Sequence, residues 1–206
     1  MEDRVWNVSP SWSLRMWRLI LFLALPVLAT AQWFVGAGAT YHRPENPDYR
    51  SVNRPALGGT LLLMSRQYCH WWYGVRMEYS PLAPLDSLPP QRHGYTDGGF
   101  LAGELRWWPW EPTQVPLYAS LALGLSTIAT TPPYDFPSRR AGSSTGFGYS
   151  IGVGGVIFYD SPCCGWFVDV ALRYHAPNAL IRSKYRPFLS SFQAIVTFNL
   201  ALGGGQ

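Results

Sequence analysis

The chain has 206 residues and a net charge of +4, and only 14% of its residues are charged whereas 16% are aromatic. This length suits a single domain, and so mild a basic excess does not favour a nucleic-acid partner. The 20 glycines and 18 prolines supply abundant turns.

The first predicted element is a secretory signal peptide within residues 1–31. Met16-Trp17-Arg18 precedes the apolar run Leu19 to Leu28, and Ala29-Thr30-Ala31 supplies the small residues of a cleavage site. The apolar run is shorter than the roughly 20 residues that a transmembrane helix needs. We therefore expect translation from Met16 or from the upstream Met1, and cleavage after Ala31. The mature domain would be residues 32–206 with a net charge of +3, and its export also argues against a nucleic-acid partner.

Eight segments of alternating polarity follow, and no segment has a convincing helical period. The predicted strands are 32–42, 56–66, 70–80, 97–108, 116–126, 145–159, 165–175 and 190–201. The links alternate in length, with long ones at 43–55, 81–96, 127–144 and 176–189 and short ones at 67–69, 109–115 and 160–164. Long loops outside and short turns in the periplasm are typical of membrane barrels. The predicted fold class is therefore all-β, an antiparallel transmembrane β-barrel of eight strands with up-and-down topology.

Alternation alone leaves open which face points inward, because a soluble lipocalin-like barrel alternates too. The aromatic residues favour the membrane. On the apolar face, tryptophans lie at the predicted periplasmic strand ends and tyrosines near the opposite ends: Trp33, Trp71, Trp107 and Trp166, then Tyr41, Tyr79, Tyr149 and Tyr174. Two such belts match the two interfaces of a bilayer. We therefore expect the apolar face to meet lipid.

The other face of the strands carries charge. In residues 165–175, Val168 and Val170 flank Asp169, and the full set comprises three residues of each sign: Arg76, Glu78, Glu104, Arg106, Asp169 and Arg173. Side chains fill the interior of an eight-stranded barrel, and buried ions need partners. We expect pairing within this set, above all between the adjacent third and fourth strands, and no open porin. Turned toward lipid near the midplane, an arginine would cost roughly 2–4 kcal/mol.

In these features the mature chain resembles the small outer-membrane barrels typified by OmpA and OmpX. The resemblance covers the mature chain and lies in architecture, without a signature motif. It implies an integral protein of the bacterial outer membrane.

A second resemblance concerns His175-Ala176-Pro177-Asn178-Ala179, which is similar to the H-x-S-N-A motif of outer-membrane lipid A 3-O-deacylases. In that family the histidine is the general base and the serine the nucleophile. Pro177 takes the place of the serine and has no hydroxyl, so His175 has no partner to activate. Ser183, Ser190 or Ser191 would have to come within hydrogen-bond reach, and residues 190–201 hold no carboxylate for the family's acidic partner. We predict no catalytic residue, with His175 as a weak candidate.

No cofactor or metal site is predicted. His42 shares the inward parity of His175, but further ligands are not evident. Cys69, Cys163 and Cys164 fall in predicted periplasmic turns, and Cys69 lies across the barrel mouth from the other two, too far for a bridge. A vicinal bond between Cys163 and Cys164 stays open as an alternative to free thiols.

Two of the long loops carry a basic excess: Arg139, Arg140, Arg182, Lys184 and Arg186. These residues either contact anionic phosphates of the outer leaflet or simply keep the loops soluble. We predict a non-catalytic barrel, monomeric or a subunit of an envelope complex, with a structural, adhesion or interaction role through its loops. Its partners would be outer-membrane lipid, lipopolysaccharide or an envelope protein. The alternatives are a lipid A deacylase-like hydrolase and a small passive channel.

Overall fold

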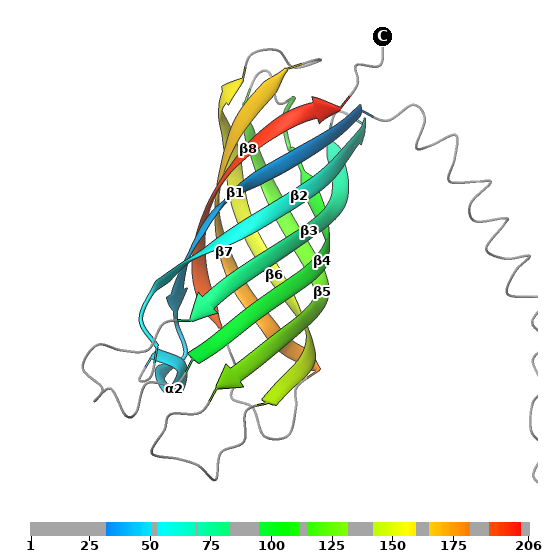
Figure 1. Ribbon diagram of the computed structural model, residues 1–206. Coiled ribbons are helices and arrows are strands. Elements are labelled where there is room, and N and C mark those ends of the chain that lie inside the picture. Colours follow the sequence, from blue (N-terminus) through cyan, green and yellow to red (C-terminus); the bar gives the residue numbers. More distant parts are fainter. Residues whose placement is uncertain are drawn as a thin grey trace, which may run out of the picture.

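The computed structural model describes residues 32–50, 53–68, 70–82, 95–111, 115–131, 142–159, 165–181 and 190–202. Eight strands in this part of the chain form a closed antiparallel barrel in which every strand pairs with its neighbour in sequence and β1 pairs with β8 (Figure 1). The strands are β1 (Gln32–Pro44), β2 (Ala56–Tyr68), β3 (Trp71–Leu82), β4 (Tyr95–Trp107), β5 (Leu117–Thr131), β6 (Gly142–Tyr159), β7 (Trp166–Ile181) and β8 (Ser191–Leu202). The predicted fold class is confirmed.

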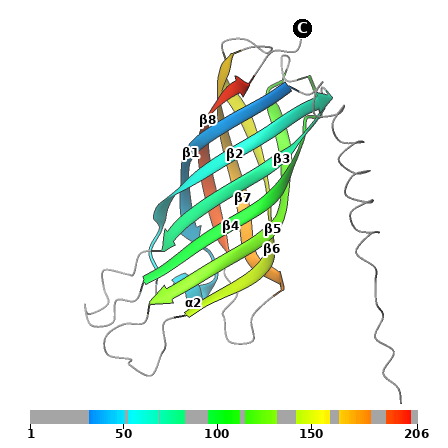
Figure 2. The same cartoon turned by 45° about the vertical axis from the view of Figure 1, so that its right-hand side comes forward.

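The two ends of the barrel differ. The short helix α2 (Pro47–Arg50) follows β1 at one end of the barrel, where β3, β5 and β7 also end (Figure 1). We call this the loop end, and we call the opposite end, where β1 begins and β8 finishes, the turn end. All eight strands are inclined to the barrel axis (Figure 2), as closure of a sheet requires. No helix in the described part of the chain is long and apolar enough to cross a membrane.

Three strands extend at least three residues farther at the loop end than predicted, and β1, β3 and β4 extend two residues farther. β5 continues to Thr131, β6 begins at Gly142 and β7 continues to Ile181. The register of β5 with β6 stays regular through Thr130 and Gly142. Sequence periodicity missed the extensions of β5, β6 and β7 because most of the added residues are small or polar, whereas backbone pairing needs no alternation of side chains.

The extension of β7 changes the setting of the deacylase-like stretch. Pro177 lies inside β7, and not in a loop that begins after His175. The register shifts here, because Tyr149 pairs with Ala176 while Phe147 pairs with Ile181. Proline has no backbone N–H to donate, so a break in regular pairing is where a strand tolerates it. The predicted link 176–189 is wrong at its start for this reason.

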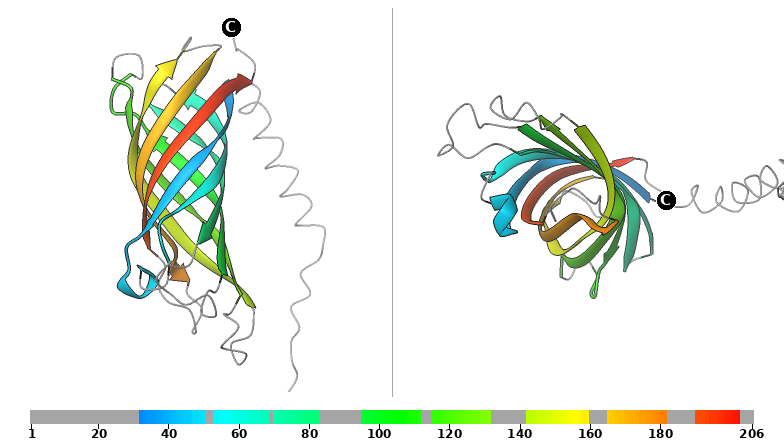
Figure 3. Two further views of the ribbon diagram at one scale, coloured as in Figure 1. Left: turned by 60° about the vertical axis from the view of Figure 1, so that its left-hand side comes forward. Right: turned by 90° about the horizontal axis from the view of Figure 1, so that it is seen from below.

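The two faces of the barrel wall have opposite character. Outward side chains such as Leu61, Met77 and Leu123 are exposed, whereas inward ones are buried, and the pattern alternates along β1 and β8. The end-on view shows the closed ring of strands that separates the two faces (Figure 3). Water-soluble monomers do not expose an apolar surface that runs around the whole molecule. The exterior is therefore suited to acyl chains, and the buried core of the protein lies inside the barrel.

The predicted aromatic belts fall at different depths. Trp33, Trp71, Trp107 and Trp166 all lie within two residues of a strand end at the turn end. Tyr41 and Tyr79 lie near the loop end of β1 and β3, with 44% and 53% of their surface exposed. Tyr149 and Tyr174 contact each other, with ring centroids 6.3 Å apart. They lie away from the strand ends because β6 and β7 extend beyond them.

Candidate functional site: the lumen and its loop-end cavity

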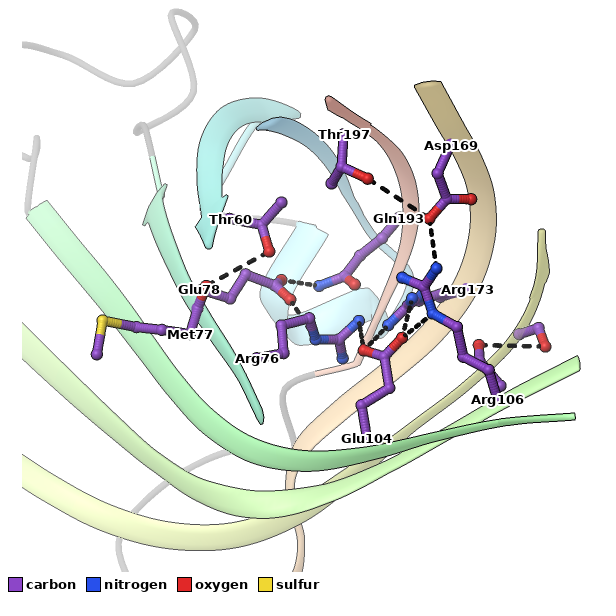
Figure 4. Close-up of polar contacts among 12 residues, drawn as sticks. Thr60, Arg76, Met77, Glu78, Glu104, Arg106, Asp169, Arg173, Gln193 and Thr197 are labelled. Atoms are coloured by element: carbon purple, nitrogen blue, oxygen red, sulfur yellow. Dashed lines mark hydrogen bonds and ion pairs between the residues drawn. The ribbon is translucent and has the colours of Figure 1, made fainter. Parts of the chain in front are cut away.

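All six predicted luminal charges lie inside the barrel, and none exposes more than 4% of its surface. Glu104 on β4 is the centre of this network (Figure 4). It accepts two hydrogen bonds from Arg173, with N–O distances of 2.8 and 2.7 Å, and one from Arg106 Nε at 2.8 Å. A two-pronged contact between a guanidinium and a carboxylate is among the strongest ion-pair geometries.

The network crosses the lumen. Arg106 Nη1 on β4 donates to Asp169 Oδ2 on β7 at 2.8 Å, and these two strands are not neighbours. Tyr118 also donates to Asp169, at 2.7 Å. Contacts between the third and fourth strands do occur, since Arg76 Nη1 lies 3.4 Å from Glu104. The contacts from Arg106 and Glu104 to β7 are nonetheless shorter. The sequence-based prediction considered mainly adjacent strands and did not anticipate them.

An apolar aromatic cluster fills the turn-end half of the lumen. Phe34 stacks on Trp72 at a centroid distance of 5.1 Å, and Trp72 contacts Trp108 at 5.0 Å. Trp108 has no exposed surface and contacts Tyr118 at 4.9 Å. Its carbonyl accepts a hydrogen bond from His70 Nδ1 at 2.8 Å, which ties the cluster to the turn between β2 and β3. The aromatic cluster and the charge network together occupy the lumen from the turn end to its middle.

A small cavity of about 30 Å³ lies between the charge network and the loop end of the barrel. Its lining includes His42, Ser80, Phe100, Ser126, His175 and Ser191. This volume holds about one or two water molecules. The rings of His42 and His175 are 6.3 Å apart, and His175 meets Phe100 edge-on at 4.8 Å. Among the described residues, no three metal-binding side chains of His, Cys, Asp or Glu come together.

A hydrogen-bonded chain fixes the state of His42. Gln193 Nε2 lies 2.6 Å from Glu78 Oε1 and 3.1 Å from His42 Nδ1. Because a carboxylate only accepts, this nitrogen is the amide donor, and its second hydrogen goes to His42 Nδ1. The imidazole hydrogen then sits on Nε2 and is donated to Ser80 Oγ, 2.7 Å away. His42 is in the wrong tautomer to take a proton from Ser80.

Sequence reasoning missed the contact between His42 and Ser80. Both residues occupy inward-facing positions of the alternating pattern, near the loop ends of β1 and β3. This shared position was the one feature of the sequence that could have predicted the contact. The strands are separated by β2, so only the register of the closed barrel brings the two side chains together.

No described hydroxyl forms a hydrogen bond with Nδ1 of the weak catalytic candidate His175. Its Nδ1 is buried without a hydrogen bond among the described residues. Ser191 is its register partner on β8, yet the described contacts include no hydrogen bond between them. Ser190 donates to Glu45 at 2.8 Å, and Ser126 donates to the carbonyl of Pro177 at 2.6 Å. Each nearby hydroxyl with a described hydrogen bond therefore points to a partner other than His175.

Several predicted residues lie outside the described part of the chain. They are the signal peptide, the loop cations Arg139, Arg140, Arg182, Lys184 and Arg186, the deacylase alternative Ser183, and the cysteines Cys69, Cys163 and Cys164.

Comparison with known proteins gives matches in structure alone. No protein-family model matches the sequence, and no curated protein is significantly similar to it. The barrel is similar to the attachment invasion locus protein Ail of Yersinia pestis, solved in complex with the heparin analogue sucrose octasulfate. The TM-score is 0.54 at 13% identity, over 84% of this chain and 99% of that chain. It is also similar to the outer membrane protein OprG of Pseudomonas aeruginosa, with a TM-score of 0.51 at 8% identity over 85% and 97% of the two chains. As its architecture implied, the chain has the fold of the small eight-stranded barrels that are integral proteins of the bacterial outer membrane.

Proposed function

We propose that this protein is a non-catalytic outer-membrane barrel that acts through contacts made at its loop end. The filled lumen is the observation that carries the proposal. Six paired charges and an aromatic cluster occupy the interior, and the apolar exterior is matched to acyl chains. Long loops of such barrels face the outside of the cell. Specific contact with a partner is therefore left to the loop end.

The chemistry of the loops supports an anionic partner. Five cations lie in two of the long links: Arg139, Arg140, Arg182, Lys184 and Arg186. The similar barrel Ail was solved with sucrose octasulfate, a densely anionic molecule. For the present chain we propose anionic groups of the same general kind, on lipopolysaccharide or on a surface polysaccharide, because arginine and lysine side chains pair with sulfate and phosphate oxygens.

Binding of a defined anion tests this proposal. The purified barrel in detergent should bind immobilised heparin, and replacement of all five loop cations by glutamine should abolish the binding at physiological salt. A matched variant, Arg54→Gln, removes a described exposed cation outside these two loops and should keep most of the binding. Equal binding by the wild type and the five-residue variant would overturn the role of the loops.

Planar-bilayer recording tests the filled lumen directly. We expect no stable conductance from the wild-type protein, because side chains occupy its interior. A stable conductance that changes in Glu104→Ala would instead identify a passive channel.

A further inference from the structure

One charged side chain breaks the apolar exterior. Among strand residues whose side chains the structure describes, Arg43 is the one charged residue that points away from the lumen. It is exposed near the loop end of β1, opposite Phe192 of β8. No described residue forms an ion pair or a hydrogen bond with its guanidinium. An arginine at this depth costs about 0–1 kcal/mol rather than the cost at the midplane, so the membrane tolerates it there.

A groove lies on the outer surface beside Arg43. Its volume is about 410 Å³, and it runs across β1, β8 and β7. Ala194 forms its floor, since this small residue pairs with Tyr41 on one side and with Leu172 on the other. Phe192 and Tyr174 form the wall toward the loop end, with ring centroids 5.7 Å apart. A trough with apolar walls therefore ends at a cation.

We propose that this groove binds an anionic lipid of the leaflet at the loop end, with an acyl chain over Ala194 and a phosphate at Arg43. The inference deepens the proposed function and rests on its membrane orientation. A guanidinium presents paired N–H donors that match phosphate oxygens, and the aromatic and aliphatic walls match a hydrocarbon chain. Tyr41 also lines the groove. Tyrosine is enriched where headgroups meet acyl chains, so a phosphate at Arg43 and an acyl chain over Ala194 would follow the order of a lipid in the membrane.

A second groove provides an internal comparison. It has a volume of about 550 Å³ and lies over β5, β6 and β7, with Trp110, Leu117 and Ala119 in its lining and no charged residue. Ala119 points outward from β5 between Trp107 and Val153, as Ala194 does from β8 between its own neighbours. The two grooves have similar apolar surfaces, but Arg43 belongs to the first alone. Selectivity for an anionic lipid is therefore expected at the first groove.

Native mass spectrometry of the detergent-purified mature barrel tests the site. The probes are dimyristoylphosphatidylglycerol and dimyristoylphosphatidylcholine, which share acyl chains and differ in net charge. We expect the wild type to retain one phosphatidylglycerol in preference to phosphatidylcholine. Arg43→Gln should reduce that preference about fivefold, because one basic residue near a membrane surface is worth about 1 kcal/mol. Arg43→Lys, which keeps the charge, should retain most of it.

The groove itself is tested by filling it. Ala194→Trp should lower retention of both lipids, whereas the matched control Ala119→Trp should leave the preference for phosphatidylglycerol unchanged. Resistance to unfolding in detergent confirms that each variant is folded. An unchanged preference in Arg43→Gln, or equal effects of the two tryptophan variants, would overturn the site. Arg43→Gln keeps the five loop cations and the loop variant keeps Arg43, so this proposal and the heparin-binding proposal fail separately.

Discussion

Arg106 and Asp169 join opposite parts of the barrel wall, through a 2.8 Å hydrogen bond from Arg106 Nη1 to Asp169 Oδ2. Their strands, β4 and β7, are separated by β5 and β6. Both side chains are buried, so each depends on the other for compensation of its charge. This contact spans the lumen, whose width is set by the number and register of the strands.

Removal of one partner should therefore destabilise the barrel strongly. The Asp169 carboxylate accepts hydrogen bonds from both Arg106 and the Tyr118 hydroxyl. Asp169→Ala removes this shared acceptor. We expect the free energy of unfolding to fall by about 3–5 kcal/mol, measured by urea unfolding of the purified barrel. The double variant Arg106→Met with Asp169→Leu removes both charges and should lose much less. A loss of under about 1 kcal/mol in Asp169→Ala would show that the pair is not coupled.

Packing beside Tyr118 depends on a glycine. A Cβ atom added at Gly154 would collide with the Tyr118 hydroxyl, whereas at Gly103 the nearest heavy atom outside its chain neighbours is 4.0 Å away. Gly154→Ala must displace Tyr118 from Asp169 and should cost about 1–3 kcal/mol of unfolding free energy. Gly103→Ala is the matched control and should be close to neutral. Equal stability of both variants would mean that Tyr118 relaxes without losing its hydrogen bond.

If the apolar face meets lipid, the cost in unfolding free energy of an outward arginine should depend on its depth in the membrane. Leu123 and Leu57 both face outward, but Leu123 lies in the middle of its pairing with β6 whereas Leu57 lies at the loop end of β2. Leu123→Arg should cost roughly 2–4 kcal/mol of unfolding free energy in lipid bilayers, and Leu57→Arg about 0–1 kcal/mol. If both variants gained stability or became soluble without detergent, the apolar face would not be a lipid contact.

Absence of catalysis is testable in cells. Because His42 donates to Ser80 and Pro177 replaces the motif nucleophile, expression of the protein should leave the acyl chains of lipid A intact. Mass spectrometry of extracted lipid A measures this directly. Loss of one acyl chain on expression of the wild type, restored in Ser80→Ala or in His175→Ala, would identify a hydrolase and contradict the non-catalytic proposal.

Local patterns in the sequence were sufficient for the architecture. A period of two residues put Leu123 and Glu104 on opposite faces, because successive side chains of a strand alternate faces whatever their partners are. The two aromatic belts then indicated that the face of Leu123 is the outer one. The alternation of long and short links predicted the antiparallel, up-and-down topology of the strands. The same patterns missed the loop-end extensions of β5, β6 and β7, where most residues are small or polar and pair through the backbone.

The interior contacts needed the tertiary structure. Glu104 was predicted to be buried, but its two-pronged contact with Arg173 depends on the diameter and register of the closed barrel. Tyr118 is uncharged, so the search for luminal charges did not identify it as a member of the network. Ser80 contacts His42 across the intervening strand β2. The sequence by itself determined which residues share a face, because side chains alternate every two residues, and its aromatic belts indicated which face meets lipid. Only the folded barrel decided which luminal groups meet, because closure brings together residues that are far apart in the chain.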